Sequence, residues 1–421
     1  MKPRTRRRLL GSLVLLIMVS LAAWVMYSRY RSVVEGHAVE SLKWSASQVN
    51  KLFKTQALKH LELDVRLSPQ RHLIDAHAAV TVASKEEGKR RFFFLLNDGL
   101  KISEVLWQGE PIRFHRLWLL TWVTLPRPLK DNEEATLHFK YSGNTAGGLM
   151  SVSSGYIDSD EILLNVDEFW FPCDLQGFYT VRVRATLPKS LKLIHTGRLI
   201  SAGSQGETQY MVFEHGRPLG GFALMAVRGP SWERTMEDGT RLKLYLTEGL
   251  QLDAERVLDM MAESQRYLKS LYGPNGYDTI AMLVSPRMRR GFNDGSSQIG
   301  LSIRYFRKGD YGYQTVAHEI AHNWWGATVA EKWLSSGTGG EWLVEGFAEF
   351  SCDIALADRF GKGALEHALL DEFFDPRRQR SVSEMSVIDN MISEPTARDT
   401  IYRKGAFVTY MLKEYLGEEL F

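Results

Sequence analysis

The segment YQTVAHEIAHNWW, residues 313–325, carries the densest cluster of potentially catalytic side chains in the chain. It contains neither Gly nor Pro and predicts a helix on which His318 and His322, four residues apart, project from one face. Two such imidazoles can bind one metal ion, and catalytic zinc sites take three protein ligands and leave a fourth position for water. Glu319 follows the first histidine directly, where it can accept the proton of that water. Ordinary amphipathic helices also carry surface His and Glu, so a third ligand is needed.

A third ligand is expected in EWLVEGFAEF, residues 341–350, which predicts a second helix after the Gly-rich stretch 335–340. Glu341 and Glu345 are four residues apart and lie on the same face of that helix. Either carboxylate would balance the charge of a metal held by two histidines. The alternative interpretation is that both are solvated helix glutamates.

These two segments resemble the zinc aminopeptidases related to aminopeptidase N, a gluzincin family that includes the leukotriene hydrolase. The family signature is HExxH, eighteen further residues, and then a Glu within a WLNEGFA-like segment. HEIAHNW at 318–324 and WLVEGFA at 342–348 match both blocks. The spacing differs, because eighteen residues after His322 lead to Glu341, whereas the motif selects Glu345, after twenty-two. We predict Glu345 as the third ligand of one Zn²⁺ per chain, with Glu341 as the alternative.

A further block, YRKGA at residues 402–406, resembles the YEKG segment that carries a catalytic tyrosine in this family. The resemblance implies that the Tyr402 hydroxyl donates to the developing oxyanion. A tetrahedral intermediate gains from such a second fixed donor beside the metal. The alternative role for Tyr402 is a half-buried aromatic on an amphipathic helix.

The resemblance extends upstream more weakly, to GLMSVSSGY at 148–156 and FWFPC at 169–173. One family element is missing. In the GxMEN motif a Glu binds the free α-amine of the substrate, but Ser297 or Gln298 takes that position in this chain. Because a desolvated ammonium group needs an anionic partner, we expect another carboxylate to replace it. The candidate substrate-binding residues are Asp167, Glu168, Asp294, Ser297 and Gln298.

Eight short β-rich runs separated by turn formers predict an N-terminal antiparallel β saddle or sandwich. The runs are LELDVRL, AAVTV, RRFFFLL, ISEVLW, LWLLTWVTL, ATLHFKY, YTVRVRATL and QYMVFEH. Helical patterns follow from about Gly229, most clearly at residues 252–271. Together with the resemblance, these patterns predict an α+β multidomain protein with a thermolysin-like, mainly helical zinc-peptidase domain. The expected bounds are 1–31 for a basic start and membrane anchor, 32–58 for a stalk, 59–229 for the β domain and 230–421 for the catalytic domain, which could be truncated at its C-terminus.

Residues 9–28 contain no charged side chain. At about 1.5 Å per residue, such a helix spans the roughly 30 Å hydrocarbon core of a bilayer. Five cationic side chains precede it within the first eight residues, which predicts a cytoplasmic N-terminus and an extracytoplasmic catalytic domain. A cleaved signal peptide and a twin-arginine signal are the alternatives to a single-pass anchor.

Composition excludes other classes. Residues 9–421 carry 47 basic and 50 acidic side chains, so no nucleic-acid partner is expected. Cys173 and Cys352 cannot form a cysteine-rich zinc site, and we expect both to be small buried residues without a disulfide. The predicted partner is a peptide substrate from which N-terminal residues are removed. Alternatives are an endopeptidase or other hydrolase on the same scaffold, or a non-catalytic metal-binding ectodomain, against which Glu319 and Tyr402 argue.

Overall fold

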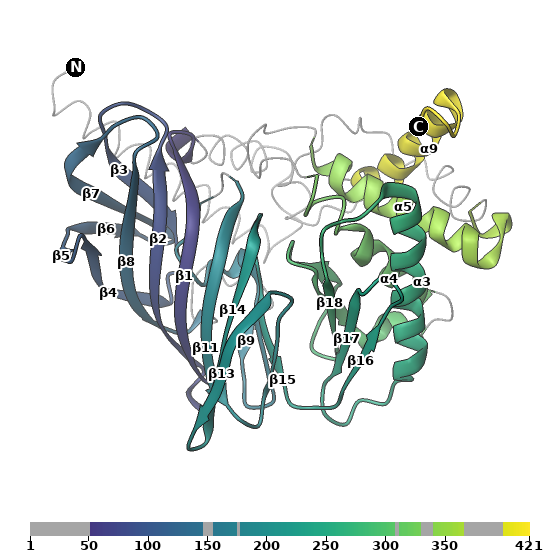
Figure 1. The fold of residues 1–421 in the computed structure, drawn as a ribbon, viewed down its shortest axis with the longest axis horizontal. Coiled ribbons are helices and arrows are strands. Elements are labelled where there is room, and N and C mark those ends of the chain that lie inside the picture. Colours follow the sequence, from purple (N-terminus) through teal and green to yellow (C-terminus); the bar gives the residue numbers. More distant parts are fainter. Residues whose placement is uncertain (1–50, 146–154, 175–176, 308–310, 330–339, 366–398) are drawn as a thin grey trace, which may run out of the picture.

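The computed structural model describes residues 51–145, 155–174, 177–307, 311–329, 340–365 and 399–421. The predicted anchor at residues 9–28 and most of the expected stalk lie outside these ranges. Within the described ranges, no helix is long and apolar enough to cross a membrane. Figure 1 shows a strand-rich N-terminal part on the left and a part with sheet and helices on the right.

The N-terminal part is built on an eight-stranded sheet. Side chains along β1 (Gln56–Ser68) alternate between buried and accessible, which gives the sheet an apolar inner face and a polar outer face. β1 pairs in parallel with β11 and antiparallel with β2. The strand order is β13 (Arg198–Gln205), β14 (Thr208–Leu219), β11 (Tyr179–Pro188), β1, β2 (Leu73–Ser84), β8 (Glu134–Gly143), β4 (Leu100–Trp107) and β5 (Glu110–Pro111).

Two smaller sheets complete this part. One contains β3 (Lys89–Leu95), β7 (Leu120–Leu129) and β6 (Phe114–Leu117), and the other β12 (Lys192–Ile194), β15 (Leu224–Val227), β10 (Glu161–Leu164) and β9 (Tyr156–Ile157). All eight predicted β-rich runs lie on strands of this region. The expected N-terminal β-sheet domain is therefore confirmed.

The C-terminal part begins with a five-stranded sheet that the sequence analysis did not predict. Its order is β16 (Ser231–Thr235), β17 (Arg241–Leu246), β18 (Thr279–Ser285), β20 (Gln298–Ser302) and β19 (Phe292–Asn293). Every residue of β18 is buried, and a short continuous apolar run cannot be assigned to strand or helix by periodicity. The expectation of mainly helical structure after Gly229 is thus wrong for this sheet. The helix expected at 252–271 is present as α3 (Ala254–Tyr272), capped by the Asp253 side chain.

The remaining helices carry the motifs described above. They are α4 (Tyr311–Ala321), α5 (Glu341–Phe360), the π-helix η6 (Thr400–Lys404) and α9 (Gly405–Leu416), and short 3₁₀ helices occur at η1 (Pro69–Arg71), η3 (Val166–Glu168) and η4 (Ile303–Arg307). The helix predicted for residues 313–325 ends at Ala321. The following residues form turns that lead to Gly326, whose φ of 113° favours glycine. Cys173 and Cys352 are buried, as expected, and are not joined to each other by a disulfide.

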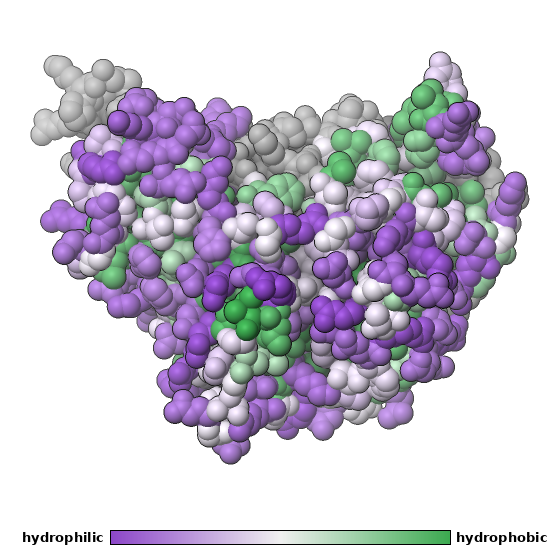
Figure 2. All heavy atoms as spheres, in the orientation of Figure 1, coloured by the Kyte–Doolittle hydropathy of each residue, from purple (hydrophilic) through white to green (hydrophobic). Residues whose placement is uncertain are grey.

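Figure 2 shows hydrophilic side chains over most of the face that is turned toward the viewer. The charged pairs Arg184–Asp64 and Lys140–Glu104 belong to the outer face of the eight-stranded sheet. The edge strand β13 is an exception, because Leu199 is 50% exposed. Figure 2 shows a group of hydrophobic atoms in the middle of this face, in the region of β13 and β14. Most apolar side chains are turned into the cores between the layers, although others, such as Val329 and Leu412, are also exposed.

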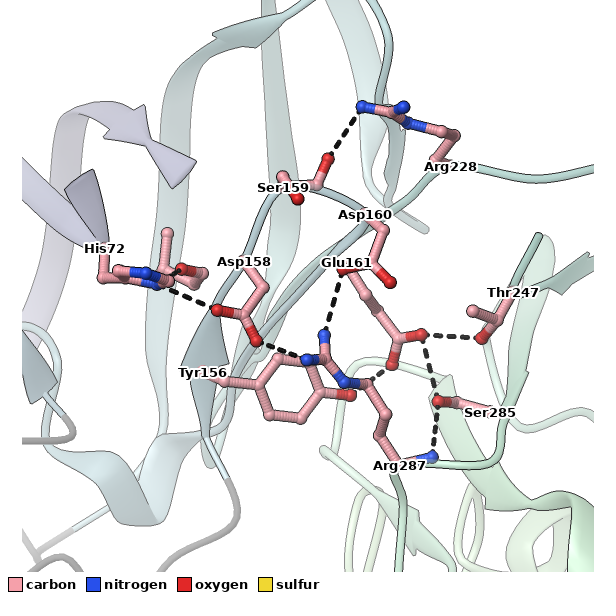
Figure 3. Close-up of polar contacts among 11 residues, drawn as sticks. His72, Tyr156, Asp158, Ser159, Asp160, Glu161, Arg228, Thr247, Ser285 and Arg287 are labelled. Carbon is pink, nitrogen blue, oxygen red and sulfur yellow. Dashed lines mark hydrogen bonds and ion pairs between the residues drawn. The ribbon is translucent and has the colours of Figure 1, made fainter. Parts of the chain in front are cut away.

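A buried polar cluster connects the two parts of the molecule (Figure 3). The Glu161 carboxylate, at the start of β10, accepts hydrogen bonds from Thr247 Oγ1 at 2.6 Å, from Ser285 Oγ at 3.0 Å and from the Tyr156 hydroxyl. Arg287 lies 4.8 Å from the centre of the Tyr156 ring and forms ion pairs with the turn that joins β9 and β10. Hydroxyls from the C-terminal sheet therefore satisfy a carboxylate from the N-terminal part.

Candidate active site

His318 and Glu319 lie in the last turns of α4, and His322 follows its end. The Nε2 atoms of His318 and His322 approach to 3.2 Å, although neither imidazole stacks on the other. α5 brings Glu345 to the same point, with its Oε2 atom 3.5 Å from His318 Nε2 and 3.3 Å from His322 Nε2. Three donor atoms from two helices thus converge.

The spacing of these donor atoms fits a zinc ion. Bonds of about 2.0–2.1 Å in a tetrahedral site separate ligand atoms by about 3.3–3.4 Å, close to the three distances above. The donor set of two imidazoles and one carboxylate is also one that catalytic zinc sites use. The residues present therefore fit the metal that the sequence predicts.

The other nitrogen of each imidazole is held by a partner outside this triangle. His322 Nδ1 lies 2.9 Å from the carbonyl oxygen of Trp325, and His318 Nδ1 lies 2.8 Å from Glu349 Oε2. The contact with the carbonyl oxygen places a proton on His322 Nδ1 and leaves Nε2 free to bind metal, and the ion-pair distance to Glu349 favours the same arrangement at His318. Glu349 is not among the residues predicted from the sequence. Its position four residues after Glu345, on the same helix face, was the available signal.

Charge in this cluster is balanced between acids and imidazoles. Burial disfavours a charged His318, but Glu345 and Glu349 outweigh this and raise the pKa of His318 well above its ordinary value. Burial alone would raise the pKa of Glu345, but His322 and His318 lower it. The carboxylates therefore attract positive charge to this point, either as protons on the imidazoles or as a metal cation that replaces them.

Glu319 is 5% exposed, and burial raises the pKa of its carboxyl group. Its Oε2 atom has no hydrogen-bond partner among the described residues. Gly291 passes so close to Oε1 that a Cβ atom at this position would collide with the carboxylate. The adjoining strand β19 is tied to α4 by Asn293, which donates to the carbonyl of Glu319 at 2.8 Å. The absence of a side chain at Gly291 thus leaves space for the Glu319 carboxylate.

Tyr402 lies in the π-helix η6. Its ring stacks on the imidazole of His318, with 5.8 Å between ring centres and an interplanar angle of 20°. A segment 84 residues from His318 in sequence therefore contributes an aromatic residue to the same site. For the other glutamate candidate, Glu341, the structure describes the backbone at the start of α5, but its side chain is outside the described set.

The candidate substrate-binding residues are not drawn into this cluster by any described contact. Asp294 is 6% exposed and accepts hydrogen bonds from the backbone of Ala223, Ser296 and Gln298 and from the side chains of Ser296 and Gln298. Gln298 also donates to the Ala223 carbonyl at 2.9 Å. These contacts occupy both carboxylate oxygens, so they do not favour the prediction that Asp294 holds an ammonium group.

The other three candidates differ in exposure. Ser297 is buried with φ of 68°, and its carbonyl accepts from Ala281 N at 3.1 Å. Asp167 is exposed on η3, whereas the neighbouring Glu168 is buried beneath Gly155, where a Cβ atom would collide with its carboxylate. Their role in substrate binding stays a prediction.

Residues 307–421 match the family model described as the peptidase family M1 domain. This range includes His318, Glu319, His322, Glu345 and Tyr402. The chain contains an M1 peptidase domain. The predicted resemblance to aminopeptidase N-like zinc metallopeptidases is thereby confirmed, and with it zinc as the metal that the family implies.

Curated relatives of the M1 domain are aminopeptidases. Aminopeptidase M1-D of Oryza sativa subsp. japonica is 23% identical over 270 residues, which are 60% of this chain and 30% of the relative. Aminopeptidase M1 of Arabidopsis thaliana is 35% identical over 111 residues, or 25% of this chain and 12% of the relative. The matched region thus spans less than a third of the length of these relatives.

Solved structures show the same fold over more of the chain. An M1 zinc metallopeptidase from Deinococcus radiodurans superposes with a TM-score of 0.70 at 19% identity, covering 87% of this chain and 84% of that chain. A mutant of the Deinococcus enzyme was solved with a Tyr-Ser-Ala substrate bound. Identity is low, but the fold similarity extends through both the N-terminal part and the M1 domain. At this level of identity the likeness shows the fold.

Proposed function

We propose that this protein is a membrane-anchored, zinc-dependent peptidase that hydrolyses peptide bonds with a metal-activated water molecule and removes N-terminal residues. The observation that carries this proposal is the convergence of His318 Nε2, His322 Nε2 and Glu345 Oε2 beside the unpaired carboxylate of Glu319. A protein that only bound metal would have no need for the buried acid.

Each residue has a role that follows from its contacts. His318, His322 and Glu345 would hold the metal, which when bound polarises the scissile carbonyl and lowers the pKa of a water molecule. Glu319 accepts the proton of that water and passes it to the leaving amine. Burial raises the pKa of its carboxyl group, which favours its holding the proton between the two transfers. The Tyr402 hydroxyl donates a hydrogen bond to the developing oxyanion.

A second candidate is an endopeptidase that uses the same chemistry. It is favoured by Ser297 and Gln298, which stand where the family has a carboxylate, and by Asp294, whose oxygens are already occupied. An ammonium group in a desolvated site without an anion is unfavourable by several kcal/mol. Aminopeptidase activity therefore needs Asp167, Glu168 or another carboxylate at the substrate N-terminus.

Hydrolysis of a peptide series with free and with N-acetylated termini tests this proposal, with zinc content measured on the same preparations. An aminopeptidase releases single residues from free peptides only, whereas an endopeptidase cleaves both series internally. Zinc absent from the purified protein, together with no hydrolysis in either series, would refute both candidates.

The anchored location is a separate part of the proposal. It is supported by the uncharged run at residues 9–28 and by the five cationic residues before it. The M1 domain would then act on extracytoplasmic peptides. Protease treatment of intact cells or spheroplasts should remove the M1 domain, and detergent should be needed to extract the full chain. Release of a shortened chain into the soluble fraction would favour a cleaved signal peptide.

A further inference from the structure

Two glycines face each other where α5 passes the start of α9. A Cβ atom added to Gly346 would lie 2.9 Å from the Cα and C atoms of Gly405, and one added to Gly405 would lie 3.0 Å from Gly346 Cα. Carbon atoms in ordinary packing are separated by about 3.5–4.0 Å. Neither glycine has a positive φ, so the backbone conformation alone would accept alanine. Only the close approach of the two backbones requires glycine here.

Each glycine belongs to a segment that contributes to the candidate active site. Gly346 directly follows Glu345 in α5. Gly405 closes the π-helix, because its backbone N–H donates to the carbonyl of Thr400, five residues earlier. Tyr402 lies inside this wide turn, and π-turns within helices often occur at functional sites. The contact thus joins the helix of a metal ligand to the helical turn of the tyrosine.

Packing contacts connect the glycine pair to the Tyr402 side chain. Ile401 is fully buried, and Trp342 of α5 and Tyr402 pack against it. Tyr402 then stacks on His318 of α4. A change in the distance between α5 and η6 would therefore move the Tyr402 ring relative to His318.

We propose that the close contact between Gly346 and Gly405 fixes the position of the Tyr402 hydroxyl, so that it can stabilise the oxyanion. The inference rests on the proposed function and adds two positioning residues to it. A methyl group at either glycine must push the helices apart by about 0.6 Å or more to restore ordinary contacts. A misplacement of about 1 Å can lower catalysis by up to 10²-fold.

The test compares Gly346→Ala, Gly405→Ala and the double variant with Gly363→Ala as a control. Gly363 lies in a helical segment, and a Cβ atom there meets nothing within 4 Å. We expect either substitution to lower kcat about 10- to 100-fold. KM and zinc content should stay near wild type. The double variant should lose little more than the worse single variant, since one methyl group already separates the helices. Gly363→Ala should behave as wild type.

Tyr402→Phe separates positioning from general damage to the fold. If the glycines act through the hydroxyl, Gly405→Ala should lower kcat in the wild type but add little in a Tyr402→Phe background. Zinc affinity, from competition with a chelator, and thermal unfolding give readouts independent of activity. Equal loss of kcat in both backgrounds, or kcat within twofold of wild type for both glycine variants, would overturn the inference. A wild-type protein that holds no zinc and hydrolyses no peptide would instead overturn the proposed function.

Discussion

Glu161 and Glu319 are both buried carboxylates, but their surroundings are opposite. Glu161 is fully buried and accepts hydrogen bonds from three hydroxyl groups (Figure 3). Glu319 is 5% exposed, and its Oε2 atom lacks a partner among the described residues. An unsatisfied buried polar group costs about 1–3 kcal/mol, and the place of this one beside the ligand cluster gives it a chemical role. The satisfied carboxylate joins parts of the fold, and the open one is available for chemistry.

Asp294 belongs with Glu161 in this comparison. It is buried and surrounded by donors from its own loop and from Ala223, at distances of 2.6 to 3.2 Å. Its residue type and its position before the motif block suggested substrate binding. Its contacts instead indicate that it shapes the turn between β19 and β20.

We call His318, His322, Glu319 and Glu345 the open cluster, and Glu161 with its three hydroxyl donors the closed cluster. The largest effect is expected from removing a metal ligand from the open cluster. Glu345→Ala should lose stoichiometric zinc and reduce hydrolysis to background, a larger effect than the about 10²- to 10⁴-fold that loss of a general base causes. Glu341→Ala is the matched control on the same helix and should retain zinc and activity. Metal analysis and peptide hydrolysis measure both. Loss of zinc in Glu341→Ala with retention in Glu345→Ala would show that the eighteen-residue spacing identifies the ligand.

The next largest effect distinguishes the two buried glutamates directly. Glu319→Gln should keep zinc and stability while kcat falls about 10²- to 10⁴-fold, because the amide cannot accept the proton. Glu161→Gln, with the same chemical change, should leave the kcat of the folded protein unchanged. Steady-state kinetics on both variants, corrected for the folded fraction, make the comparison. It would fail if Glu161→Gln lowered kcat as much as Glu319→Gln does.

A third prediction concerns stability. Glu161→Ala removes an acceptor shared by three hydroxyls and should lower the free energy of unfolding by about 3 kcal/mol. Glu207→Ala, at an exposed position, should change it by less than about 0.5 kcal/mol. Denaturant unfolding measures both. A Glu161→Ala variant as stable as the Glu207→Ala control would mean that the cluster in Figure 3 does not hold the two parts together.

The sequence predicted the open cluster better than the closed one. The spacing of His318 and His322 predicts that both imidazoles face one metal ion, whereas Glu345 is selected by the resemblance of its segment to the family motif and against the family spacing. The strands with alternating side chains, such as β1, were also predicted, because one of their faces meets water. The buried strand β18 was not, since its apolar run has no alternation.

Interactions between distant segments leave no local pattern. Glu161 meets Ser285 across 124 residues, and no spacing in the sequence relates them. Gly346 and Gly405 meet in the same way, although each lies in a motif whose predicted functional residue is a neighbour, Glu345 or Tyr402. Residues whose role depends on tertiary contacts were therefore missed even when the segment was recognised.

The smallest expected effect concerns Glu349, which shares features of both kinds of buried carboxylate. It is paired, since its Oε2 atom is 2.8 Å from His318 Nδ1, yet its partner belongs to the open cluster. Partners that orient a ligand histidine typically contribute about 10- to 100-fold to metal affinity. Glu349→Ala should therefore weaken zinc binding by this factor, while Glu349→Gln, which keeps an acceptor oxygen, should weaken it less.

Competition with a chelator measures this loss, and Asp358→Ala, at an exposed position of the same helix, is the control. At saturating zinc, kcat of Glu349→Ala should recover most of its wild-type value, because the residue orients a ligand and does not touch the reacting atoms. Its stability without zinc should change little compared with that of Glu161→Ala. If Glu349→Ala bound zinc normally but unfolded as easily as Glu161→Ala, then Glu349 would belong with the closed cluster, and a partner near the metal would no longer indicate a role in metal binding.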